Sequence, residues 1–260
     1  MTEPYLIDVH AHLQDEKFNG ELESLVEAAE AAGVRKIINA ATCIESAKQA
    51  VEIAQKFPAC YATAGIHPHD ASKFSNNSIE ILKQILQRPK VIAVGEIGLD
   101  FHYDFSPRPV QEKVFEQLWL LAVELKKPVV VHVREAFSSF FDIIKTLPPS
   151  EKVLLHCFSG DREIARRAAD LGFHFSVGGA LTFPKSDQTR EVFSYLPVEM
   201  IHLETDCPYL APQPKRGKRN EPSLLAVTFD FLTALRKVEP LTFKQQLQKN
   251  ARNLFGPELF

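Results

Sequence analysis

The sequence predicts an α/β fold, a (β/α)8 TIM barrel that spans residues 1–260 as a single domain and carries extra C-terminal helices. Three observations predict it. Eight short β-rich runs mostly lack polar alternation, as strands covered on both faces do, and helical patterns lie between them. Eight such units in roughly 210 residues favour a closed barrel over an open sheet. No GxGxxG sequence follows the first run, which disfavours a dinucleotide-binding sheet.

The expected elements follow in order along the chain. The strands cover residues 5–11, 34–40, 60–68, 91–99, 128–133, 152–160, 173–179 and 200–206. Apolar residues at helical spacing predict helices over residues 21–33, 44–57, 78–88, 110–127 and 162–172, the first of them ending on Gly33. Beyond the last strand lie a proline-rich loop, 207–222, and two helical segments, about 223–237 and 242–254, which are too short for a second domain.

Composition narrows the classes of function. The net charge of −3 excludes a global polycation, so a nucleic-acid partner requires a local basic surface. The four cysteines form no CxxC pair, which is typical of free thiols in a reducing compartment. The first residues lack a signal-peptide pattern, and no run of 18 apolar residues predicts a membrane span. We therefore expect a cytoplasmic protein without a membrane partner.

Histidines and carboxylates stand at the ends of five of the expected strands. Because the carboxyl ends of barrel strands meet at one face, these six groups are expected to converge there. A set of imidazoles and carboxylates without thiolates suits zinc, manganese or magnesium, and six groups exceed one tetrahedral site. Two ions that share a bridging Glu96 fit better. The predicted ligands are His10, His12, Glu96, His132, His156 and Asp206.

The sequence resembles the TatD family of metal-dependent deoxyribonucleases, a branch of the amidohydrolase-like barrels. The resemblance runs in order through "DVHAHL", "AGIHPHD", "VGEIGLDF", "HVREA", "HCFSG", "ETDCPYLAP", "KRNEP" and "NARNLFG". It implies exonuclease action on DNA from a single-stranded or frayed 3′ end. It also implies two ligand sets: one metal is held by His10, His12, Glu96 and Asp206, and the other by Glu96, His132 and His156.

Other polar residues near the expected barrel mouth suit contacts with the substrate. Asp206 is expected to orient the attacking water and accept its proton, which makes it catalytic together with the bridging Glu96. Arg134 lies two residues beyond a predicted ligand histidine, so it shares the inward face and can clamp a phosphate or form a salt bridge to Glu135 or Asp100. His67 and His69 can bind a phosphate or brace their loop.

A basic run follows the last strand. Lys215, Arg216, Lys218 and Arg219 fall within five residues of the loop that should overhang the mouth. Position favours contact with a nucleic-acid backbone over a merely solvated surface. The aromatic residues on neighbouring loops, Phe101, Tyr103 and Phe183, can stack a base or pack locally.

Two carboxylates lie one step deeper than the ligands. Glu204 and Asp8 are expected to orient ligand histidines or to form buried ion pairs. Strand alternation is expected to turn Cys157 and Cys207 away from the metals. Two rival functions stay open at this point. One is hydrolysis of a carbonyl centre, such as an aminoacyl-tRNA ester or an amide, and the other is a non-catalytic binding barrel, whose broken ligand set is not seen here.

Overall fold

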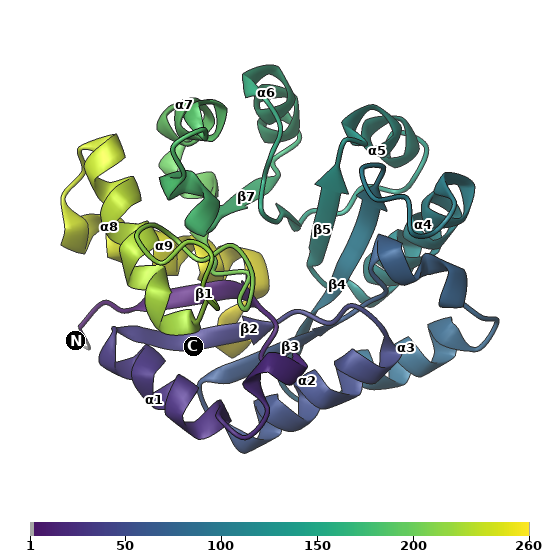
Figure 1. The fold of residues 1–260 in the computed structure, drawn as a ribbon. Helices are drawn as coiled ribbons and strands as arrows, with labels where there is room; N and C mark the ends of the chain where they lie inside the picture. Colours follow the sequence, from purple (N-terminus) through teal and green to yellow (C-terminus); the bar gives the residue numbers. More distant parts are fainter. Residues whose placement is uncertain (1–2, 260) are drawn as a thin grey trace.

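A computed structural model describes residues 3–259 and shows one sheet of eight parallel strands in the order β1 to β8. The strands form a nearly closed barrel, so the predicted fold class is confirmed (Figure 1). Their bounds are Leu6–Ala11, Val34–Asn39, Cys60–Ala64, Val91–Asp100, Val129–Arg134, Val153–Leu155, His174–Val177 and Ile201–Leu203. Strands β3, β6 and β8 end earlier than predicted, and their polar ends continue as loops.

Helices surround the strands, as Figure 1 shows. Helices α1 to α9 span Leu22–Ala31, Ile44–Lys56, Ser78–Leu86, Arg108–Leu125, Phe137–Ile144, Arg162–Asp170, Asp187–Tyr195, Leu225–Arg236 and Pro240–Phe255. The sequence pattern did not place α5 and α7. Helix α5 has eight residues and α7 has nine.

Local signals in the sequence explain where the helices begin and end. Gly33 has a φ of 81°, which a glycine adopts without strain just after α1. The Asp161 carboxylate accepts a hydrogen bond of 2.9 Å from Ile164 N and caps the first turn of α6.

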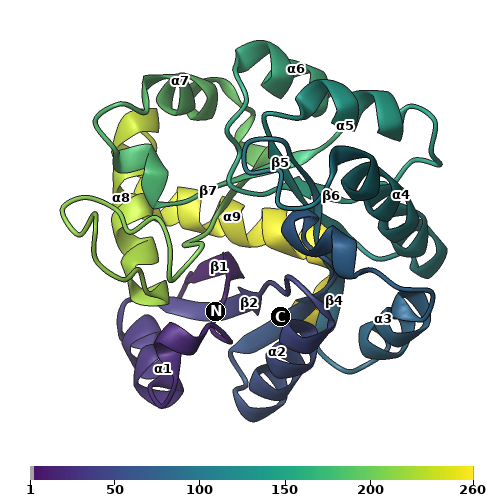
Figure 2. The same cartoon turned by 45° about the vertical axis from the view of Figure 1, so that its right-hand side comes forward.

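The end of α9 closes the amino-terminal end of the barrel. Its buried residues Ala251, Leu254 and Phe255 form one cluster with side chains from β1 to β6. A single helix end can contact six strands of a barrel only if it lies across the end of the barrel. Figure 2 shows α9 passing behind the strands. The opposite, carboxyl-terminal end is therefore the open one, where catalytic groups of such barrels lie.

The first strand joins the loop after the last strand at that open end. His12 N donates to Cys207 O over 2.8 Å, and Asp206 N donates to His10 O over 2.9 Å. Two predicted ligands are thus fixed beside a third by backbone hydrogen bonds. Among residues 3–259, no helix has the length and apolar character needed to cross a membrane.

Candidate metal centre

An irregularity in β4 aims Glu96 into the barrel. The pairing of β4 with β5 shifts register between Val94 and Ile97, so β4 carries an extra residue at this point. Glu96 N donates to Ala41 O over 2.7 Å. Gly98 has a φ of 146°, and a Cβ on it would lie 1.9 Å from His132 O. Only glycine permits this close approach of β4 to the strand that carries His132.

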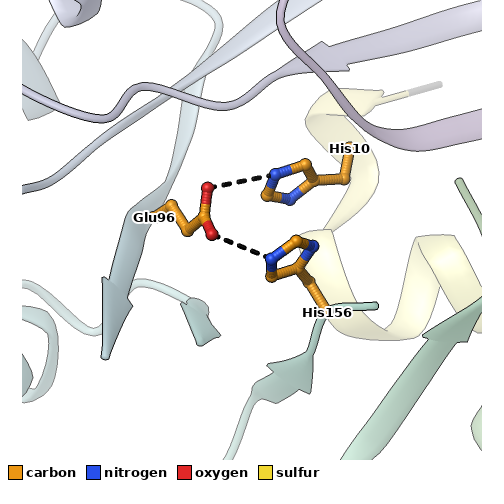
Figure 3. Close-up of side chains that lie close together, drawn as sticks. All are labelled: His10, Glu96 and His156. Atoms are coloured by element: carbon orange, nitrogen blue, oxygen red, sulfur yellow. Dashed lines mark ion pairs between the residues drawn. The ribbon is translucent and has the colours of Figure 1, made fainter. Parts of the chain in front are cut away.

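The Glu96 carboxylate divides its two oxygens between histidines from different strands. Oε2 lies 3.3 Å from His10 Nε2, and Oε1 lies 2.8 Å from His156 Nε2. Figure 3 shows both oxygens turned toward these rings. The two imidazoles stack with centroids 3.8 Å apart. A carboxylate held this way can serve two neighbouring groups at once.

One group lies on the β1 side of Glu96. His12 Nε2 is 3.2 Å from Asp206 Oδ1, and His10 Nε2 is 3.3 Å from His12 Nε2. The His12 ring donates from Nδ1 to Ala40 O over 2.9 Å, which leaves the lone pair of Nε2 facing the group. His10, His12 and Asp206 offer ligand atoms within 4.8 Å of one another.

The other group lies on the β5 side. His132 Nδ1 is 3.0 Å from Glu96 Oε1 and 3.2 Å from His156 Nε2. His67 Nε2 also approaches Glu96 Oε1, at 3.3 Å. The His67 Nδ1 accepts a hydrogen bond from His69 N, so in the neutral ring Nε2 carries the hydrogen. Burial lowers the pKa of His67 to about 4, which keeps the ring neutral and Nε2 a donor.

The donor set fits divalent cations. Burial alone would raise the pKa of Glu96, yet His156, His67 and His10 hold it well below its usual range. Burial also opposes ionisation of Asp206, but the neighbouring His12 lowers its pKa. Both carboxylates are therefore ionised at neutral pH, beside imidazole lone pairs that converge on the same space. This arrangement is what zinc, manganese or magnesium sites require.

Asp206 lies in a loop rather than on a strand. Its φ is 56°, a left-handed conformation that costs energy for most residues other than glycine. Buried Asn220 supports the loop, because its Nδ2 donates to Thr205 O and to Tyr209 O over 2.7 Å each. Asn220 appears in the "KRNEP" motif, but no sequence signal pointed to this bracing role.

The two deeper carboxylates behave differently. Glu204 Oε2 accepts from Ser176 Oγ over 2.6 Å and lies 3.6 Å from His156 Nδ1, a position from which it can orient this ring. Within residues 3–259 Asp8 forms no hydrogen bond or ion pair with an imidazole ring. It accepts hydrogen bonds from Thr205 N and Oγ1, and from the backbone N of His10, so it braces the Asp206 loop instead.

Asp100 is the site residue that sequence reasoning missed. Its Oδ2 accepts hydrogen bonds from His69 Nε2 over 2.8 Å and from His132 Nε2 over 3.2 Å. A donor N–H at Nε2 leaves the Nδ1 lone pair of His132 facing Glu96. The signal was present in "VGEIGLD", where Asp100 ends β4. The sequence had offered it only as a salt-bridge partner for Arg134.

A cavity of about 710 Å³ opens beside the cluster. Arg134 lines it, as its inward position predicted, and its guanidinium lies 4.8 Å from the Tyr103 ring centroid. Within residues 3–259 Arg134 forms neither of the expected salt bridges. Cys157 also lines the cavity, contrary to the prediction, because β6 ends at Leu155 and strand alternation stops there. Cys207 is buried, as expected of a residue turned away.

The arginines and the lysines of the basic run have different surroundings. Arg219 donates to both oxygens of Glu21 and to Glu221, so its guanidinium is turned to these carboxylates rather than to the mouth. Arg216 lies 4.3 Å above the Phe183 ring. Lys215 and Lys218 are exposed and form no ion pair within the described part of the chain. None of the four lines the cavity.

An eight-stranded barrel with a histidine and carboxylate cluster at its open end defines a metal-dependent hydrolase. The profile of the family described as "TatD related DNase" matches residues 7–256. The chain belongs to this family, as its motifs predicted.

Similar proteins cover nearly all of the chain. It is 36% identical over 257 residues to the "3'-5' ssDNA/RNA exonuclease TatD" of Edwardsiella piscicida, with 96% of this chain and 99% of that protein covered. It is 34% identical to the "Uncharacterized metal-dependent hydrolase YabD" of Bacillus subtilis, with 96% and 98% covered. The crystal structure of YjjV, a TatD homologue from Escherichia coli K12, superposes with a TM-score of 0.91 at 34% identity, with 96% and 97% covered.

Proposed function

We propose that this protein is a 3′–5′ exonuclease that hydrolyses phosphodiester bonds at single-stranded or frayed 3′ ends of DNA with two divalent ions. One observation carries the proposal: Glu96 presents one oxygen to the His10 side and the other to the His156 side of a single cluster. Two-ion sites of this kind stabilise both the attacking and the leaving oxygen of a displacement at phosphorus. The relative from Edwardsiella piscicida is named a 3'-5' ssDNA/RNA exonuclease, which supports a single-stranded nucleic acid as the substrate.

His10, His12, Glu96 and Asp206 would hold one ion, and Glu96, His132 and His156 the other. When bound, such ions supply Lewis-acid chemistry, which makes water a stronger acid and neutralises charge on the phosphate.

The protein's own groups then have separate tasks. Ionised Asp206 orients the attacking water and accepts its proton. His67 and Arg134 both line the cavity, where the Nε2–H of His67 and the guanidinium of Arg134 would donate to phosphate oxygens.

The decisive experiment compares substrates. Single-stranded DNA labelled at the 3′ or the 5′ end, matched RNA and an aminoacyl-tRNA are each incubated with the protein under Mg²⁺, Mn²⁺ or Zn²⁺. We expect early release of labelled mononucleotide from 3′-labelled DNA, and gradual shortening of 5′-labelled DNA. Release of the amino acid from aminoacyl-tRNA without loss of nucleotides would assign a carbonyl hydrolase instead. No turnover under any ion would indicate a binding barrel.

A variant of the bridge excludes a contaminating nuclease. Glu96→Ala, purified in the same way, should lose the activity and retain less metal on both sides, because Glu96 approaches both groups. Equal activity in the variant preparation would show that the nuclease is not this protein. Two ions per chain in Glu96→Ala would contradict the bridging role.

A further inference from the structure

Exposed aromatic and aliphatic side chains concentrate at the mouth of the cavity. Of the eight large apolar side chains exposed within residues 3–259, four lie on the two loops that follow β4 and β8. Isolated exposed apolar residues are normal on protein surfaces, but a cluster beside a catalytic site indicates a binding surface. The four are Tyr103, Phe105, Tyr209 and Leu210.

Two of these residues stack on each other. The rings of Tyr103 and Phe105 lie 5.2 Å apart with planes 13° from parallel. Phe105 is 68% exposed, the highest value among the large apolar side chains, so its ring remains open to a further planar group. Tyr103 lines the cavity, whereas Phe105 is not among its lining residues, so the pair extends from the cavity wall outward.

The loop that carries the pair is fixed in place. Asp100 Oδ1 accepts hydrogen bonds from His102 N and Tyr103 N, over 3.0 Å and 3.1 Å. Ser106 Oγ donates to His69 O over 2.9 Å, and the His69 ring meets Phe105 edge-on at 4.7 Å. A surface held this way loses little conformational entropy when a ligand binds.

Charged side chains lie next to the metal cluster, and aromatic rings lie farther out. Asp100 contacts His132 on the inner side, Arg134 lies over the Tyr103 ring, and Phe105 lies farther out. A single-stranded nucleic acid has the same alternation, with a phosphate at the metal cluster and at Arg134 and a base beside it. Stacking on aromatic rings accepts any base, because every base has a π face.

We propose that Tyr103 and Phe105 form a stacking platform for a nucleobase that flanks the scissile phosphate. This inference rests on the proposed nuclease function and deepens it. The platform holds the strand without reading its sequence, and Phe105 supplies the outer ring face.

The test combines variants of Phe105 with abasic substrates. Binding to the metal-loaded protein is measured with oligothymidylates that carry a nuclease-resistant 3′ linkage and one abasic residue, placed at each of the last positions in turn. We expect Phe105→Ala to raise Kd for the intact strand about tenfold, since stacking one base is worth roughly 1–3 kcal/mol. For one abasic position the difference between the two proteins should disappear. Phe105→Trp should restore binding, whereas Phe105→Leu, which keeps apolar bulk, should not.

A matched control and a separate readout keep the outcomes distinct. Tyr195 on α7 is 41% exposed and does not line the cavity, so Tyr195→Ala should bind as the original protein does. A penalty in Phe105→Ala that persists for every abasic position, or an unchanged Kd for the intact strand, overturns the platform. Failure of the unmodified protein to cleave any phosphodiester overturns the proposed function instead.

Discussion

Asp206 shows at the scale of one residue how backbone and chemistry combine. Its φ of 56° belongs to a region in which asparagine and aspartate are enriched, because their short polar side chains satisfy the local backbone. Asp206→Asn therefore preserves the conformation of the loop while it removes the charge and the basicity. This makes the variant a clean test of the proton acceptor.

We expect Asp206→Asn to reduce kcat by roughly 10²–10⁴-fold, the usual contribution of general acid–base catalysis. Metal content should fall less, because His10, His12 and Glu96 remain. The measurement combines kcat, metal stoichiometry and the circular dichroism spectrum of the same preparation. Near-normal kcat with full metal content would remove Asp206 from proton transfer, and a lost helical signal would assign it a structural role.

Asp100 contacts His132 and His69, so we expect it to act as a positioning residue. Asp100→Asn keeps the shape but weakens the orientation of both rings, and we expect metal affinity or activity to fall about 10- to 100-fold. Excess metal should restore part of the activity. Asp104 lies in the same loop, paired with Arg108 at 2.8 Å on the surface. Asp104→Asn is therefore the matched control, and an equal loss in both variants would refute the positioning role.

At the scale of elements, the loop after β8 carries basic side chains with two different surroundings. Lys215 and Lys218 are free to contact phosphates, whereas Arg219 is paired with Glu21 and Glu221. For single strands each phosphate contact adds about 0.7 to the slope of log K against log salt concentration. Replacing both lysines with serine should therefore lower the slope by about 1.4. The same measurement on Arg219→Ser should show little change in slope. An unaltered slope in the lysine variant would leave the run as a solvated surface.

The elements also show what the sequence could and could not predict. The convergence of candidate ligands such as His132 was predictable because apolar runs mark the strands, and the barrel brings their carboxyl ends together. The extra residue in β4 was not predictable, since it depends on the approach of Gly98 to His132 O. The role of Asp8 followed from a loop conformation rather than from strand alternation. Arg219 was predicted to contact a nucleic-acid backbone but pairs with Glu21 and Glu221. The sequence alone does not decide between a phosphate and a carboxylate as the partner of an arginine, because tertiary contacts make that choice.

At the scale of the whole molecule, a histidine pair at the other end of the barrel affects stability. His174 Nδ1 and His202 Nε2 form a hydrogen bond of 2.9 Å, and His202 is buried. Burial lowers the pKa of His174 to about 4 and holds the pKa of His202 well below its usual value. Between about pH 6.5 and these folded values, the unfolded chain binds protons that the folded chain does not. The free energy of unfolding therefore falls as the pH decreases below about 6.5.

His202→Asn should reduce this acid sensitivity. We expect the Tm of the metal-loaded variant to fall less than that of the original protein between about pH 7.5 and pH 4.5. Both proteins share the histidines of the metal cluster, so the difference between their curves isolates the pair. Parallel curves would show that His202 binds its proton alike in the folded and unfolded chains.

The junction between β1 and the loop after β8 has a consequence for biosynthesis. Asp8 accepts a hydrogen bond from Thr205, 197 residues away in the sequence, and Asp206 N donates to His10 O. A chain that leaves the ribosome from its amino terminus presents His10 and His12 long before Asp206. The two histidines are therefore without Asp206 until the loop after β8 has been synthesised. The proposed ion site, with all four of its side chains in place, therefore forms only after the loop that follows β8 has been synthesised.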